Sequence, residues 1–332
     1  MNVILFAWCP SAGPYIDALP ASGGALRLVV TGVRGSAAAA LAPACERAGV
    51  ELVRCPDVND ASFVRRIESH RPALLLVAGC SQILGRALRD AAGLGAVNLH
   101  PSLLPSYSGK EPLFWALLRG EPRVGITAHV MTDALDAGPI LLQREVPVPP
   151  RATSATLAED VDREGAALLP DLLAMARRGA LLDAGAPEPG ASPEIPGAGP
   201  LDPRWPASHF PALRPEHGLL DWARSAMELD RLVRACAGEI HAYTFFRGMR
   251  LVLLEAEPID ALPARFPAAA ALSPGAAVLG MDRGALLVAA QQGALLTRRW
   301  LFMGRVHSGE ELAAAVDIRP GARLTSSPAF LE

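Results

Sequence analysis

The chain of 332 residues is long enough for two domains, and a composition of 51% hydrophobic and 20% charged residues is typical of a globular protein with buried cores. The net charge of −3, with thirty arginines and a single lysine, argues against a strongly basic nucleic-acid binder, because neutralising many phosphates requires an excess of positive charge. No apolar stretch approaches the roughly eighteen to twenty residues of a membrane span.

The five cysteines show neither a CxxC motif nor the spacing of metal ligands, which indicates reduced thiols and no metal site. The first residues, MNVILFAWC, contain no basic side chain and too short an apolar run for a signal peptide. We therefore expect a cytoplasmic protein that does not contact membranes.

In the first hundred residues, short apolar runs alternate with amphipathic ones. The apolar runs are rich in branched residues and end at Gly, Pro or polar breaks, which predicts strands, and the amphipathic runs predict helices. Alternation of this kind predicts an α/β fold with a doubly wound, Rossmann-like, mostly parallel sheet, whose ligands bind outside the carboxyl ends of the strands. The predicted strands are 2–7, 25–32, 50–55, 73–79 and 96–100, and the predicted helices are 36–49 and 59–70.

The pattern changes after residue 122. Two longer β-like runs, 123–132 and 139–148, are joined by the loop DALDAG and followed by an amphipathic helix over 154–179. A helix over 219–238 and several short β runs then predict a small β-barrel. We predict a catalytic domain over 1–182, a Pro/Gly-rich linker over 183–216 and a β-barrel domain over 217–325.

The sequence Asn98-Leu99-His100 lies at the end of a predicted strand, immediately before Pro101. Residues two apart in a strand point to the same face, so an amide and an imidazole project side by side. The amide can stabilise an oxyanion, and the imidazole can accept a proton near neutral pH. A carboxylate could orient that imidazole, and Asp133 and Asp136 are both candidates.

Five stretches of the sequence carry a family resemblance. NLHPSLLPSYSG and WALLRGEPRVGITAHVMTDALDAGPILLQ resemble the signature of the folate-dependent formyltransferases, and RPEHGLLDW, RLVRACAG and AYTFFRGMRL resemble the linker and OB-like carboxyl-terminal domain of that family. The resemblance implies that Asn98, His100 and Asp136 form a catalytic trio. It also implies that 10-formyltetrahydrofolate binds to the first domain, its pterin held by two segments with the following candidate residues: Ser81, Gln82, Ile83 and Leu84 in one, and Met131 and Asp133 in the other.

The formyl acceptor is predicted from departures from the family pattern. The basic insertion that tRNA-modifying members carry after the second strand is missing, and Arg34 is the only charged residue between 29 and 42. Residues 217–331 contain twelve arginines against eleven acidic residues. We therefore expect a small-molecule primary amine, such as an amino sugar, an amino acid or a natural-product intermediate, with methionyl-tRNA as the second candidate. Lys110 and Glu111 are the candidate acceptor-binding residues, although both can also be read as loop residues.

Two other classes of function remain for comparison. A noncatalytic folate-binding or partner-binding module is the third hypothesis, and the intact trio argues against it. A dinucleotide oxidoreductase is disfavoured, because AWCPSAG follows the first predicted strand where GxGxxG would stand. His129 is interpreted as a strand histidine that is hydrogen-bonded within the fold.

Overall fold

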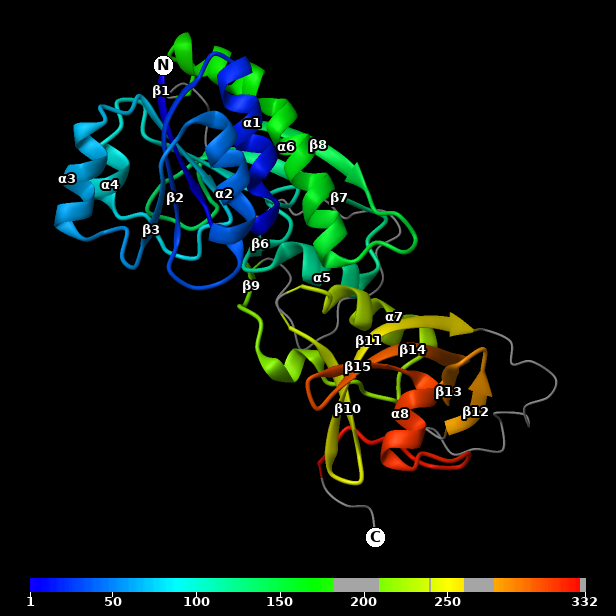
Figure 1. Cartoon of the computed structure of the whole chain (residues 1–332). Coiled ribbons are helices and arrows are strands. Elements are labelled where there is room, and N and C mark those ends of the chain that lie inside the picture. The colour runs from blue at the N-terminus through cyan, green and yellow to red at the C-terminus, as the bar shows by residue number, and fades with distance from the viewer. Residues whose placement is uncertain (182–208, 239, 260–277, 329–332) are drawn as a thin grey trace. The chain divides into compact units, whose positions relative to one another are not determined.

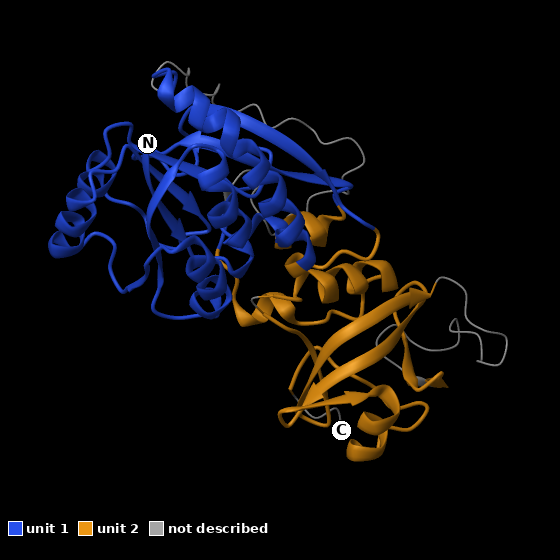
Figure 2. Cartoon of the chain, turned by 45° about the horizontal axis from the view of Figure 1, so that its top comes forward, with its two compact units in different colours: residues 1–113, 121–149, 156–211 blue, residues 114–120, 150–155, 212–332 orange. Residues whose placement is uncertain are grey.

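The computed structural model describes residues 1–181, 209–238, 240–259 and 278–328. The chain divides into two compact units (Figure 2). The first contains residues 1–113, 121–149 and 156–211, and the second contains residues 114–120, 150–155 and 212–332. Two short segments of the first half of the chain thus belong to the second unit, which no feature of the sequence indicates.

The described part of the first unit is built on a seven-stranded sheet in the order β3-β2-β1-β4-β5-β7-β8 (Figure 1). The strands from β3 to β5 are parallel, and β7 and β8 are antiparallel to their neighbours. The chain order reverses between β1 and β4, which is the topological switch point of a doubly wound sheet. The strands are β1 (Asn2–Ala7), β2 (Ala25–Gly32), β3 (Leu52–Cys55), β4 (Leu74–Ala78), β5 (Ala96–His100), β7 (Arg123–Val130) and β8 (Ile140–Pro147).

Helices cover this sheet. One face packs against α3 and α4 through a core that includes Phe6, Val77 and Leu88. Asp60 caps α3 by accepting hydrogen bonds from the main-chain N–H groups of Ser62 and Phe63, as expected for an acidic N-cap residue. The helices are α1 (Gly13–Ala21), α2 (Ala37–Ala48), α3 (Ala61–Ser69), α4 (Arg86–Asp90) and α6 (Ser154–Arg177), with the 3-10 turn η1 (Pro10–Ala12).

The second unit contains an antiparallel sheet in the order β10-β11-β14-β13-β12, with β15 paired to β14. Leu287, Leu296 and their neighbours form its apolar core. The elements are β10 (Ala242–Phe246), β11 (Met249–Ile259), β12 (Val278–Asp282), β13 (Ala285–Ala289), β14 (Ala294–Phe302), β15 (Arg305–Ser308), α7 (Ala226–Ala235), α8 (Gly309–Val316) and η2 (Pro215–Gly218). Helix α5 (Pro112–Arg119) begins in the first unit, and most of its residues belong to the second.

The predicted α/β class, with a mostly parallel sheet and a second β domain, is confirmed. The helix predicted over 219–238 is shorter, because Ser225 and Glu228 form a capping box at which α7 begins. Most of the predicted linker, residues 183–208, lies outside the described residues, so the three-part division remains a prediction. None of the helices described here is long and apolar enough to cross a membrane.

Candidate active site

Strands β5 and β7 bring four polar side chains to the same face of the sheet. In their antiparallel register Asn98 pairs with His129, and His100 pairs with Thr127. Because residues two apart share a face, all four side chains lie together. The strand end predicted to carry Asn98 and His100 therefore receives a second histidine from the neighbouring strand.

Asp136 provides the carboxylate next to these side chains. Its Oδ1 atom lies 3.7 Å from His100 Nδ1 and 3.7 Å from His129 Nε2, and its side chain is only 5% exposed. The main-chain N–H of Gly109 donates to its other oxygen at 2.8 Å. Asp136 has a φ of 51°, the left-handed conformation that Asp and Asn adopt more readily than most residues. The loop that contains Asp136 takes this conformation at Asp136, and the carboxylate there faces both histidine rings.

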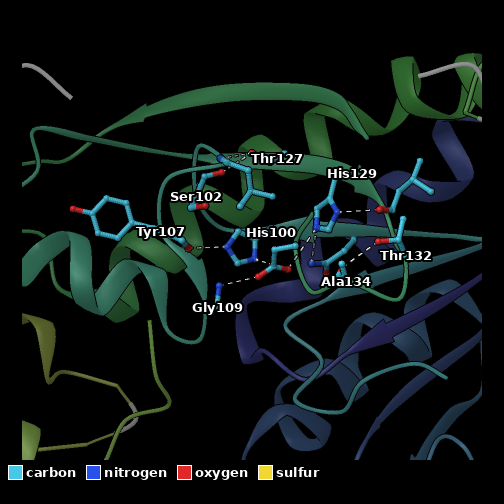
Figure 3. Close-up of polar contacts among 12 residues, drawn as sticks. His100, Ser102, Tyr107, Gly109, Thr127, His129, Thr132 and Ala134 are labelled. Carbon is cyan, nitrogen blue, oxygen red and sulfur yellow. Dashed lines mark hydrogen bonds and ion pairs between the residues drawn. The ribbon is translucent and has the colours of Figure 1, made fainter. Parts of the chain in front are cut away.

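His100 is oriented by its second ring nitrogen. Its Nε2 atom lies 3.0 Å from the carbonyl oxygen of Tyr107, which can only accept, so Nε2 carries a proton (Figure 3). In the neutral ring the Nδ1 lone pair then faces Asp136. The 3.7 Å separation is too long for a direct hydrogen bond, but it is close enough for the carboxylate to stabilise an imidazolium. The arrangement therefore suits His100 as a proton acceptor.

His129 is neutral in this environment. Burial and, to a smaller extent, the neighbouring His100 together lower its pKa to about 4, although Asp136 opposes the shift. His129 Nδ1 donates to the carbonyl oxygen of Val130 at 3.1 Å, so its Nε2 must accept. Figure 3 shows the rings of His100 and His129 with dashed polar contacts drawn between them.

Asn98 is held by His129. The Asn98 Nδ2 atom donates to His129 Nε2 at 3.1 Å, which fixes the orientation of the amide. One amide N–H of Asn98 remains for another partner. That N–H could stabilise negative charge developing on an oxygen atom beside His100.

The loop after His100 is fixed by local contacts. Tyr107 has a φ of 57°, its ring stacks on Phe210 at 5.1 Å, and its hydroxyl donates to Glu121. Residues Ser108–Gly109 form the short strand β6, which pairs with β9 (His209–Phe210). These contacts hold both the Tyr107 carbonyl that orients His100 and the Gly109 N–H that binds Asp136.

Lys110 does not point freely into solvent. Its ammonium donates to the carbonyl oxygen of Ser81 at 3.0 Å, and its main-chain N–H donates to Phe210. The lysine therefore joins the loop after His100 to the segment predicted to hold the folate. Glu111, the other candidate acceptor-binding residue, has a φ of 53° in the same loop.

The two segments predicted to hold the pterin are tied together by Arg89, on α4. Arg89 is buried, and its guanidinium donates to the carbonyl oxygens of Leu84 and Thr132 at 3.0 Å each and forms an ion pair with Asp133. Asp133 forms its ion pair with Arg89, whereas Asp136 faces the histidines. The two carboxylates of the DALDAG loop therefore have different partners. Of these two carboxylates, Asp136 is the one that lies beside His100 and His129.

The remaining predicted cofactor residues differ in their surroundings. The Gln82 side chain bonds to Val58 N–H and to the Pro56 carbonyl, Leu84 is fully buried, and Met131 packs on the core below the site. Ile83 is 70% exposed. The Gln82 amide thus anchors its own segment to the neighbouring loop.

Main-chain donors remain available in both segments. Within the described residues, the N–H groups of 81–83 and 132–135 donate to no protein atom. Nearly all of these residues are exposed, so their N–H groups are open to water or to a ligand, and their place in two segments joined by Arg89 is compatible with a flat ligand rich in acceptor atoms, as a pterin is. No group of three or more His, Cys, Asp or Glu residues in the described ranges could hold a metal ion.

Two family models match the chain, formyl transferase over residues 34–173 and formyl transferase, C-terminal domain, over residues 212–314. A methionyl-tRNA formyltransferase of Syntrophus aciditrophicus is 33% identical over 265 residues, which cover 77% of this chain and 80% of that protein. The chain belongs to the formyltransferase family. It is an enzyme of the family whose folate-dependent members use 10-formyltetrahydrofolate as the formyl donor.

Solved structures share the fold of this formyltransferase. HypX from Aquifex aeolicus has a TM-score of 0.63 at 14% identity, with 95% of this chain and 47% of HypX covered, so the chain spans about half the length of HypX. A sugar N-formyltransferase from a Shewanella species has a TM-score of 0.53 at 21% identity, with 73% of this chain and 92% of that chain covered.

Two residues of the site are not predicted from the sequence. His129 is hydrogen-bonded within the fold as expected, but its partner is Asn98, and it also faces Asp136. The signal was present, since Thr127 and His129 repeat the two-residue polar spacing of Asn98 and His100 in an otherwise apolar strand. Arg89 had no such signal, because its role depends on two main-chain carbonyls from distant loops.

Proposed function

We propose that this formyltransferase moves the formyl group of 10-formyltetrahydrofolate to a primary amine, with Asn98, His100 and Asp136 as its catalytic residues. The observation that carries the proposal is the Asp136 carboxylate, which is buried within 3.7 Å of both histidine rings and lies beside an oriented asparagine amide. Such a set combines a base, a charge that stabilises the protonated base, and an oxyanion donor.

The proposed reaction assigns one step to each residue. The amine nitrogen attacks the formyl carbon, and the free N–H of Asn98 stabilises the charge that develops on the formyl oxygen. His100 Nδ1 accepts the proton that the amine loses, and Asp136 stabilises the resulting imidazolium. The bond from the formyl carbon to folate N10 then breaks, and the proton passes to N10, which leaves tetrahydrofolate and the formylated amine.

The first candidate acceptor is methionyl-tRNA. Relatives that cover 75% to 78% of this chain at 29% to 33% identity are named methionyl-tRNA formyltransferases, which reverses the order reached from the sequence. A small amine is the second candidate. It is favoured by the absence of a basic segment between β2 and α2 and by the balanced charge of residues 217–331.

An acceptor assay tests the proposal. The purified chain is incubated with 10-formyltetrahydrofolate and either methionyl-tRNA or a panel of amino sugars and amino acids, and tetrahydrofolate formation is followed. Turnover that requires charged tRNA and falls steeply with added salt supports the first candidate, because salt weakens contacts with phosphates. Turnover with a free amine, insensitive to salt, supports the second. Failure of every amine to release tetrahydrofolate would contradict formyl transfer.

A further inference from the structure

Trp8 lies at the carboxyl end of β1, in line with His100. The sheet register pairs Ala7 with Ala78 and Ala78 with Leu99, so the next residues along the three strands, Trp8, Gly79 and His100, form one row. The main-chain N–H of Trp8 donates to the carbonyl oxygen of Ala78 at 3.1 Å, so the pairing between β1 and β4 continues past the end of β1. Neighbouring strands are about 4.8 Å apart, so Trp8 and His100 are separated by roughly 10 Å.

Both side chains project from the same face. Phe6 and Trp8 stack with parallel rings at 6.3 Å, and Phe6 shares its face with Val77 and, through the register, with Asn98. His100 follows Asn98 by two residues and therefore shares that face as well. Gly79 lies between Trp8 and His100 and has no side chain to separate them.

The indole of Trp8 lies over Gly32, at the end of β2. A Cβ atom at Gly32 would come within 2.4 Å of Trp8 Nε1, so only glycine allows this position of the ring. The indole is partly exposed, and the N–H at its Nε1 donates to no side chain or carbonyl in the described residues. Tryptophan N–H groups usually have a partner when they are buried, so this donor is available to a ligand.

The segment around Trp8 is poorly suited to a phosphate. Pro10 at the start of η1 and Pro14 at the start of α1 remove two main-chain donors, and no Arg, Lys or His side chain occurs before Arg27. The switch point between β1 and β4 is where doubly wound folds bind ligands, and here an aromatic ring borders it. An aromatic ring of this kind packs well on an uncharged, apolar group.

We propose that Trp8 is a specificity-determining residue of the acceptor site, where its indole packs on an uncharged, apolar group attached to the carbon that bears the amine. This inference rests on the proposed formyl transfer and narrows the acceptor to amines such as those of apolar amino acids. Gly32 contributes by leaving room for the ring.

The test compares two acceptors that differ only in the side chain beside the amine. Methioninamide and glycinamide are used if the enzyme accepts amides, and methionyl- and glycyl-tRNA if it requires tRNA. Trp8→Ala is expected to lower kcat/KM for the methionyl acceptor by about tenfold or more and for the glycyl acceptor by less than about threefold. Tetrahydrofolate binding, followed by calorimetry, is expected to stay unchanged.

Gly32→Ala supplies a second variant that keeps the tryptophan and displaces its ring. It is expected to reduce the preference for the methionyl acceptor as Trp8→Ala does. Gly93→Ala is the matched control, since a Cβ there meets no atom within 4 Å. A wild-type enzyme that does not prefer the methionyl acceptor, or a Trp8→Ala variant that loses the same factor with both acceptors, would overturn the role of Trp8 while leaving formyl transfer intact. An inactive wild-type enzyme would overturn both.

Discussion

Replacing Asp136 by asparagine removes one negative charge and little else. Asparagine has the same shape, can accept the hydrogen bond from Gly109 N–H, and tolerates the φ of 51° at this position better than alanine does. The change therefore isolates the effect of the carboxylate charge on His100.

The distance to His100 sets the size of the effect. Two opposite unit charges 3.7 Å apart attract by about 4 kcal/mol at the effective dielectric constant of about 20 that describes protein sites. If the imidazolium of His100 is largely formed in the transition state, losing that attraction lowers kcat by about three powers of ten. Two to four powers of ten is the range expected for a lost acid-base or electrostatic group.

The assay follows tetrahydrofolate release at saturating acceptor, with circular dichroism as the check on folding. Asp317→Asn is the control, because Asp317 also has a positive φ, of 57°, but lies in the second unit, paired with Arg319. The control is expected to keep wild-type activity. A folded Asp136→Asn enzyme with kcat within tenfold of wild type would refute the charge-stabilised base.

Three further predictions concern neighbouring residues. Arg89→Met is expected to weaken tetrahydrofolate binding in calorimetry about tenfold or more, because it removes the hydrogen bonds that join the segments of Leu84 and Thr132. Arg86→Met, on the exposed side of the same helix, should have no effect. Lys110→Met is expected to raise the KM of either the folate or the acceptor about tenfold, with kcat little altered. Unchanged KM values for both substrates would show that Lys110 contacts neither of them and only holds the loop. The pKa of His129 is lowered to about 4, so the unfolded chain binds its proton first as pH falls below about 6.5, and the free energy of unfolding should decrease between pH 6.5 and 4. In His129→Asn this part of the decrease should disappear from urea titrations.

Much of the first unit could be predicted because local pattern and tertiary structure agree there. β1, β2 and β5 have the predicted bounds, since each is a continuous apolar run that ends at a clear break. Helix α1 was not foreseen, because Pro14 and Pro20 and the absence of polar periodicity conceal it. The shared face of Asn98 and His100 follows from the two-residue period of a strand.

The site beyond that pair depends on contacts between distant segments. The choice between Asp133 and Asp136 came from the family resemblance, and in the structure it depends on Arg89, which pairs with Asp133. The contact of His129 with Asn98 depends on the register of β5 with β7. A single sequence contains no direct signal for a register or for a guanidinium that binds two main-chain carbonyls.

In the proposed reaction, His100 accepts the amine proton during formyl transfer from folate. The most direct test is a single-turnover reaction of 10-formyltetrahydrofolate with the preferred acceptor, comparing wild type and His100→Ala, with the formylated product identified by mass spectrometry. Wild type is expected to form formylated product and tetrahydrofolate in equal amounts, and only when the amine is present. A folded His100→Ala enzyme that still binds tetrahydrofolate is expected to react more slowly by about two to four powers of ten. An equal rate in the two enzymes, or tetrahydrofolate released without any formylated amine, would contradict the proposed reaction.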